Sequence, residues 1–141
     1  MQKYPIKLDD SCIEVYFTSD AIYISGKLKL EIRQRMVIVT GDLSGSEVYS
    51  IREGRKKVVY LHHSGVGLKC PKAQILSDVS SPLAHVKSTK TRLGSFVTIL
   101  TPGQFFIDYL IVSDDALVVV IPGRREVIVE RGRDATVLYI I

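Results

Sequence analysis

The strongest constraint on the fold is the abundance of apolar β-branched residues. The chain of 141 residues contains 17 Val and 15 Ile, close to a quarter of the sequence. Such side chains lose rotamer freedom in helices and pack well on pleated sheets. A chain of this length fits one domain, in which folding buries about two-thirds of the unfolded surface. We therefore expect a single all-β domain over residues 1–141.

Four short β-rich runs follow one another in the C-terminal third. They cover residues 105–112, the run from Leu117 to Ile121, residues 126–130 and residues 136–141. The separators have hairpin length and carry Gly, Pro, Asp or Ser, which favour tight turns. This pattern predicts a four-stranded antiparallel meander. Because the run from Leu117 to Ile121 has no polar position, we expect a second sheet, a closed barrel or a partner subunit to cover both of its faces.

The N-terminal half has the same character. Strands are expected at residues 12–18, 21–33, 36–40, 47–51 and 57–63. Leu28, Leu30 and Ile32 alternate with charged residues, which predicts one dry and one wet face. Gly26 interrupts its run and indicates a bulge or a sharp bend. The whole chain should hold nine or ten strands, arranged as an antiparallel β-sandwich or a partly open β-barrel.

Residues 64–95 lack a strong period. They contain closely spaced Gly and Pro and a cluster of Ser, and short helical turns are expected at 73–79 and 82–86. An irregular segment of this length in a compact domain is usually functional, disordered or misread. If the protein has a functional site, we expect it in this segment.

Composition limits the functional classes. The chain has no Asn, while Lys, Arg and Glu together supply 25 residues, a pattern typical of thermophile proteins. The formal net charge is +4, which permits binding to polyanions without requiring it. The N-terminus has no apolar leader and the longest apolar run, from Ala116 to Ile121, is too short to span a membrane. We expect a cytoplasmic protein that does not bind membranes.

The two cysteines, Cys12 and Cys70, do not form a disulfide framework. Two buried free thiols are the simpler interpretation. A single bridge remains open, because thermophile cytosols tolerate disulfides.

A basic turn at residues 52–57 is the first candidate binding site. Its cations are Arg52, Arg55, Lys56 and Lys57, with one acid, Glu53, among them. Tyr49 and Tyr60 lie on the strands that enter and leave the turn. Such a hairpin could bind phosphates and stack a base, or could equally be a solvated turn with both tyrosines in the core.

Two further clusters of cations follow. Lys87, Lys90 and Arg92 are interleaved with hydroxyl residues, a combination that suits phosphate contacts but that also suits a solvated loop. Arg124, Arg125, Arg131 and Arg133 form the last cluster. We expect Arg131 and Arg133 to face Asp114 and Asp115 in a surface ion-pair network rather than a nucleic acid.

No catalytic or metal motif is specific. His63, Cys70 and His85 have ligand types that suit zinc, but their spacing matches no known finger or ribbon. Cys70 and the serines 77, 80 and 81 are candidate nucleophiles, with His62, His63 or His85 as base, but no Gly-x-Ser-x-Gly motif is present. Asp108 interrupts an apolar run, which predicts an Arg partner or an inward charge that guards an edge strand.

Three functions remain after this reading. The first is a non-catalytic module that binds single-stranded DNA or RNA through the basic turn, the segment from Lys87 to Arg92 and the tyrosines. The alternative is a structural or protein-interaction module, such as a viral or assembly component, that forms a homo-oligomer through the run from Leu117 to Ile121 or through the C-terminal strand. An enzyme with its site in residues 62–92 ranks last. No cofactor is implied.

Overall fold

The structure is a computed structural model that describes residues 2–52, 55–101 and 106–141. Within this part of the chain every regular element is a β-strand, and fifteen strands form two antiparallel sheets packed as a sandwich, with no closed barrel. The all-β prediction is confirmed, and of the two predicted architectures the sandwich is the one observed. The described residues include no helix long and apolar enough to cross a membrane.

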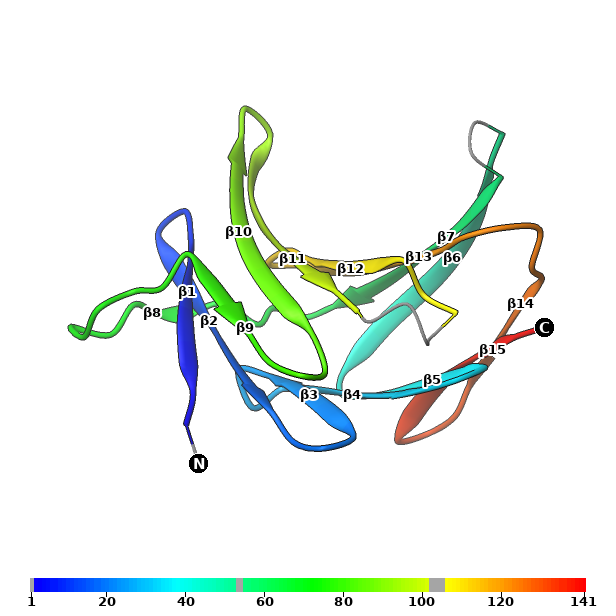
Figure 1. The fold of residues 1–141 in the computed structure, drawn as a ribbon, viewed down its shortest axis with the longest axis horizontal. Helices are drawn as coiled ribbons and strands as arrows, with labels where there is room; N and C mark the ends of the chain where they lie inside the picture. Colours follow the sequence, from blue (N-terminus) through cyan, green and yellow to red (C-terminus); the bar gives the residue numbers. More distant parts are fainter. Residues whose placement is uncertain (1, 53–54, 102–105) are drawn as a thin grey trace.

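The first sheet, sheet A, joins strands from the two ends of the chain (Figure 1). In spatial order its strands are β1 (Tyr4–Leu8), β2 (Ser11–Phe17), β3 (Ala21–Ile24), β4 (Leu28–Arg33), β5 (Met36–Thr40), β15 (Ala135–Ile140) and β14 (Val127–Arg131). The short strand β8 (Leu68–Lys69) pairs with β2. The last two strands therefore extend a sheet that the first five begin.

The second sheet, sheet B, is built from the middle of the chain. In spatial order its strands are β6 (Leu43–Ile51), β7 (Lys56–His63), β13 (Ala116–Ile121), β12 (Tyr109–Val112), β11 (Gly94–Leu100), β10 (His85–Thr91) and β9 (Asp78–Ser80). The prediction that the four C-terminal strands form one antiparallel meander is therefore wrong. β12 and β13 lie in sheet B, while β14 and β15 form a hairpin in sheet A.

The segment 64–95 differs most from expectation. It holds β8, β9, β10 and the start of β11, and the helical turns predicted at 73–79 and 82–86 are absent from these described residues. The bend predicted at Gly26 is confirmed. Ser25 and Gly26 have φ of 51° and 65°, and Lys27 N–H donates to the Ile24 carbonyl at 3.0 Å, which makes a tight turn of residues 25–27 between β3 and β4.

The core lies between the two sheets and follows the period of two. In β4, Leu28, Leu30 and Ile32 are buried, as their alternation predicts. In β13, Leu117, Val119 and Ile121 belong to the main core, whereas Val118 and Val120 face away from sheet A. Val120 is nevertheless only 3% exposed. Its cross-strand partners Tyr109 and Val58 lie on either side of it. Side chains of the same sheet therefore help to bury this face of β13, for which the sequence predicts cover by a second sheet or a partner subunit.

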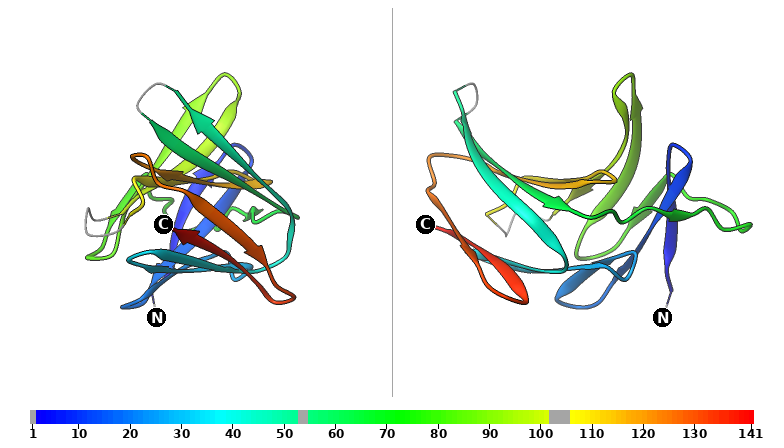
Figure 2. Two further views of the ribbon diagram at one scale, coloured as in Figure 1. Left: turned by 90° about the vertical axis from the view of Figure 1, so that its right-hand side faces the viewer. Right: turned by 180° about the vertical axis from the view of Figure 1, so that it is seen from behind.

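Sheet B is strongly curved. Figures 1 and 2 show the β6–β7 and β10–β11 hairpins rising on the same side of the molecule at the two ends of the sheet, with β12 and β13 between them. We call these hairpins the first arm (β6–β7) and the second arm (β10–β11). The basic turn predicted at 52–57 belongs to the first arm, and the segment from Lys87 to Arg92 belongs to the second.

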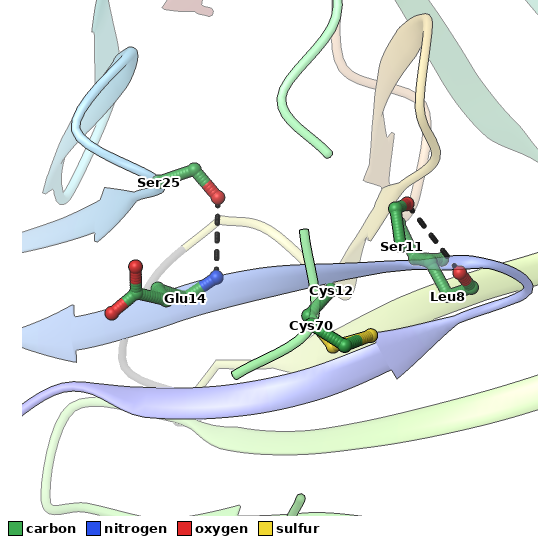
Figure 3. Close-up of a disulfide and its surroundings, with 6 residues drawn as sticks. All are labelled: Leu8, Ser11, Cys12, Glu14, Ser25 and Cys70. Carbon is green, nitrogen blue, oxygen red and sulfur yellow. Dashed lines mark hydrogen bonds between the residues drawn. A yellow bond between two sulfur atoms is a disulfide. The ribbon is translucent and has the colours of Figure 1, made fainter. Parts of the chain in front are cut away.

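A disulfide bond joins Cys12 in β2 to Cys70, which follows β8 (Figure 3). Their Cα atoms are 4.9 Å apart and the bridge closes a loop with a sequence separation of 58. The preferred interpretation of two free thiols is therefore wrong. The short pairing of Cys12 with Leu68 brings β8 against β2, which places Cys70 within reach.

Candidate nucleic-acid interface

The face of sheet B that is turned away from sheet A, here called the outer face, carries two rows of cross-strand partners. One row runs from β10 to β6 through Lys87, Thr98, Ile111, Val118, Tyr60 and Glu47. The next row runs through His85, Leu100, Tyr109, Val120, Val58 and Tyr49. Partners in an antiparallel sheet share a face, so aliphatic and aromatic side chains form the middle of this face, with Lys87 at one end.

Both aromatic residues of the predicted site, Tyr49 and Tyr60, lie on this outer face and not in the core. Tyr49 is 50% exposed and its ring meets that of Tyr60 edge to face, with centroids 5.5 Å apart. The Tyr49 hydroxyl donates to the Glu47 carboxylate at 2.6 Å, and this contact raises the pKa of Tyr49. A hollow of about 440 Å³ opens beside the pair, lined by residues of β6 and β7 that include Ile51, Val58 and both tyrosines.

Lys56 is held by a carboxylate on the same face. Its Nζ lies 2.9 Å from Asp108 Oδ2 and 5.9 Å from the centre of the Tyr109 ring. The bond to Asp108 raises the pKa of Lys56. Asp108 is half-exposed rather than buried and pairs with a Lys, so the prediction of an Arg partner or of an inward, edge-guarding charge is wrong in both forms.

Lys57 points to the opposite side of the strand from Lys56, because neighbouring residues of a strand alternate. Its Nζ lies 3.5 Å from Glu126 Oε2, a carboxylate that is 76% exposed. The contact is long and solvated, so it contributes little to stability. Arg52 and Arg55 are exposed at the turn, and Arg55 has φ of 52°. Glu53 lies outside the described residues.

Arg124 is a residue of this site that the sequence reasoning missed. β13 pairs with β7 and places Ile121 opposite Lys57, so the turn that follows β13 lies at the same end of the sheet as the basic turn. A hollow of about 300 Å³ lies there, and its lining consists of Arg55, Lys56, Lys57, Arg124 and Glu126 together with Ser50, Ile51 and Gly123. Among the described residues, four cations and one carboxylate line this hollow. The run of arginines at 124–125 was visible in the sequence, but its neighbour across the sheet was not.

The three cations of the second arm do not act as one group. Lys87 lies on the outer face. Lys90 faces the other way, toward the β1–β2 turn, where its charge lowers the pKa of Asp9 together with the stronger hydrogen bonds from Ser95. Arg92 lies in the turn between β10 and β11.

The structure therefore brings Tyr49, Tyr60, Lys56 and Lys87 onto one face and puts Lys57 and Lys90 on the opposite side of their strands. Four strand spacings separate β10 from β7, which is about 19 Å along the row that joins Lys87 to Tyr60. The two arms can contact one extended ligand, but they do not form one compact pocket.

Two arginines of the last predicted cluster contact protein groups. Arg131 donates to the Leu43 carbonyl at 3.1 Å, and Arg125 lies 3.6 Å from the centre of the Phe106 ring. Asp114 accepts from Gly67 N–H. Among the described residues, the ion pairs predicted between Arg131 or Arg133 and Asp114 or Asp115 are not present, so that prediction is wrong.

The histidines do not converge on a metal site. Cys70 is bonded to Cys12 and His85 contacts Ser80 and Asp78. His63 is 6% exposed, and its Nδ1 accepts from Gly65 N–H at 3.1 Å. Burial lowers the pKa of His63. The described part of the chain holds no group of three His, Cys, Asp or Glu residues arranged to bind a metal.

The first arm thus combines a basic hollow with an adjoining aromatic hollow, and Ile51 lines both. Cations can contact phosphate oxygens, and exposed rings can stack on bases. No family model, curated protein or solved structure matches the chain.

Proposed function

We propose that the protein binds single-stranded nucleic acid along the first arm, without catalysing a reaction on it. The observation that carries the proposal is the contact between the two hollows. Phosphates occupy the basic hollow of Arg55, Lys56, Lys57 and Arg124, and bases stack beside it on Tyr49 and Tyr60. Lys87 lies on the same face and supplies a second phosphate contact toward the other arm.

Charge neutralisation reduces the strength expected of this site. Lys56 is paired with Asp108 and Lys57 with Glu126. The Glu126 pair is the weaker of the two, because it is longer and its carboxylate is mostly exposed, so a phosphate can replace it. Binding should therefore rest mainly on Arg55 and Arg124 and should be lost at moderate salt.

The test is fluorescence anisotropy with a labelled single-stranded oligonucleotide over a series of salt concentrations. Replacing Arg55 and Arg124 together by Ala should flatten the plot of log affinity against log salt by about 0.7 per lost phosphate contact. Tyr60→Leu should weaken binding by about 1–3 kcal/mol per unstacked base and leave the slope unchanged.

A matched pair of replacements serves as the control. Lys72→Ala with Arg133→Ala removes the same charge from exposed positions outside both hollows and should leave the slope nearly unchanged. If wild-type protein does not bind at low salt, or if the control pair reduces the slope as much as the Arg55 and Arg124 pair, the proposal is refuted.

A second candidate function is self-association, and the exposed edge of sheet B favours it. β6 is the last strand of the sheet, and Val48, Tyr49 and Ile51 are 42%, 50% and 45% exposed on it. An edge strand presents unpaired backbone groups that pair readily with another chain. The two segments predicted to mediate self-association, in β13 and β15, cannot add a strand from another chain at their edges, because each is paired with a strand on both sides. Light scattering distinguishes a strict monomer from a dimer, and Val48→Lys should dissociate a dimer formed through β6.

A further inference from the structure

A serine, a histidine and an aspartate form a hydrogen-bonded series at the other edge of sheet B. Ser80 and Asp78 belong to β9, and His85 begins β10. Ser80 Oγ lies 2.6 Å from His85 Nδ1, and His85 Nε2 lies 2.8 Å from Asp78 Oδ1. A hydroxyl, a base and a carboxylate that orients the base are the groups that activate a serine nucleophile.

The strand register explains why the hydroxyl and the imidazole are so close. Ser80 and His85 are direct cross-strand partners. Ser81 N–H donates to the Ala84 carbonyl at 2.8 Å, so the 81–84 pair is hydrogen-bonded and the next pair, Ser80 with His85, is not. Side chains approach each other most closely at non-hydrogen-bonded pairs, where the Cα atoms are about 4.5 Å apart.

Asp78 reaches the same imidazole from the diagonal position. It lies two residues before Ser80 on the same face of β9 and opposite Lys87. The two contacts define the tautomer of His85 that satisfies both partners: Nε2 carries the proton and donates to Asp78, and Nδ1 accepts from the Ser80 hydroxyl. In this state the free electron pair of Nδ1 faces the proton of Ser80, as a general base requires.

The edge position leaves a backbone donor for the substrate. Because Ser80 is in a non-hydrogen-bonded pair, its N–H points away from β10. β9 is the edge strand of sheet B on the side opposite to β6, so no further strand of the sheet lies beyond this N–H. Among the described residues no backbone acceptor pairs with this N–H. An N–H beside the nucleophile can stabilise the oxyanion of a tetrahedral intermediate.

A hollow of about 690 Å³ adjoins the serine. Its lining includes Ser80, Ser81, Leu83, Tyr4 and Phe17, so it presents hydroxyls together with apolar surface. His85 is 41% exposed at its side chain and Asp78 52%. The imidazole and the carboxylate are therefore open to solvent.

We propose that Ser80 is the nucleophile of an acyl-transfer site that accepts small, uncharged carboxylic esters. Ser80 Oγ bonds to the carbonyl carbon while its proton passes to His85 Nδ1. The bond from this carbon to the alcohol oxygen then breaks, and the leaving alcohol takes the proton from His85. Water, activated by the same nitrogen, releases the acid and restores Ser80. Ser80 and His85 are the catalytic residues and Asp78 is a positioning residue.

The experiment uses the whole protein with two probes: p-nitrophenyl acetate as the ester and a fluorophosphonate as a serine-directed label. We expect a single fluorophosphonate adduct on Ser80 by peptide mass spectrometry, and loss of both the adduct and the esterase rate in Ser80→Ala. His85→Gln should slow both reactions by about 10²-fold. Ser77→Ala is the matched control, since it removes another exposed serine from the same segment and should change neither reaction.

The positioning role of Asp78 must be tested by a measurement that a general loss of structure would not change in the same way. Asp78→Glu should keep more of the labelling rate at Ser80 than Asp78→Asn, because the negative charge of a carboxylate stabilises the imidazolium that forms on His85, whereas an Asn amide is uncharged. Equal labelling of Ser77 and Ser80, or an esterase rate that survives in Ser80→Ala, overturns the proposal. Oligonucleotide binding by Ser80→Ala should equal that of wild type, so this test is independent of the nucleic-acid proposal.

Discussion

Breaking the Cys12–Cys70 disulfide should destabilise the fold by about 4 kcal/mol. The bridge closes a loop with a sequence separation of 58, and the loss of loop-closure entropy in the unfolded chain gives this magnitude at 25 °C. Two residues of β8 pair with β2, at Ser11 and Cys12, and Leu76 N–H donates to the Pro5 carbonyl at 2.9 Å, so the bridge is one of few links between this segment and sheet A. The variant should carry Ala at both positions, because Cys12 is fully buried and a serine there would bury an unpaired hydroxyl.

The assay is equilibrium unfolding in guanidinium chloride, with and without a reductant. The oxidised wild type should be more stable than the double variant by about 4 kcal/mol, and the reduced wild type should match the variant. The m-value should rise when the bridge is absent, since the unfolded chain then exposes more surface. The variant is its own control, because reductant should not change its midpoint. Two free thiols in the native protein, or an unchanged midpoint after reduction, would refute the reasoning.

Two other predictions concern stability. Burial lowers the pKa of His63, so below the ordinary histidine pKa of about 6.5 the unfolded chain binds more protons than the native protein. The free energy of unfolding should therefore fall as the pH drops through that value. Urea titrations at two pH values should show a smaller fall for His63→Gln than for the wild type. Gly41→Ala should cost about 2–3 kcal/mol, because φ is 152° and a Cβ would lie 2.5 Å from Leu28 Cδ2 and 2.6 Å from the Lys27 carbonyl oxygen. Gly26→Ala, with φ of 65° and nothing within 4 Å of the added Cβ, should cost only about 1–2 kcal/mol, and equal losses would contradict the steric argument.

Local patterns predicted the parts of the fold that depend on local chemistry. The alternation in β4 and the bend at Gly26 follow from side-chain period and turn preference, and both are confirmed. β10 was missed because its outer face carries Lys87 and Thr89 while the side toward sheet A carries Ser88 and Lys90 near the β1–β2 turn. Without an apolar face, the strand shows no period of two in hydropathy.

The candidate sites needed information about distant pairs. Arg124 joins the basic turn only because β13 pairs with β7, and nothing in either segment predicts that pairing. Cys70 likewise reaches Cys12 through β8, a strand too short to leave a pattern. Ser80 and His85 were recognised as candidate residue types, but their separation depends on the register of the β9–β10 hairpin, which composition does not encode.

The pairing of β5 with β15 has a consequence for how the molecule assembles. Val37 lies opposite Leu138, so all seven strands of sheet B come, in sequence, between two neighbouring strands of sheet A. Contacts this distant along the chain must overcome a large loss of entropy before they contribute any favourable energy, and topologies of this kind fold in about milliseconds to seconds. During synthesis, the edge of β5 therefore stays unpaired until the last strand of the chain has been made.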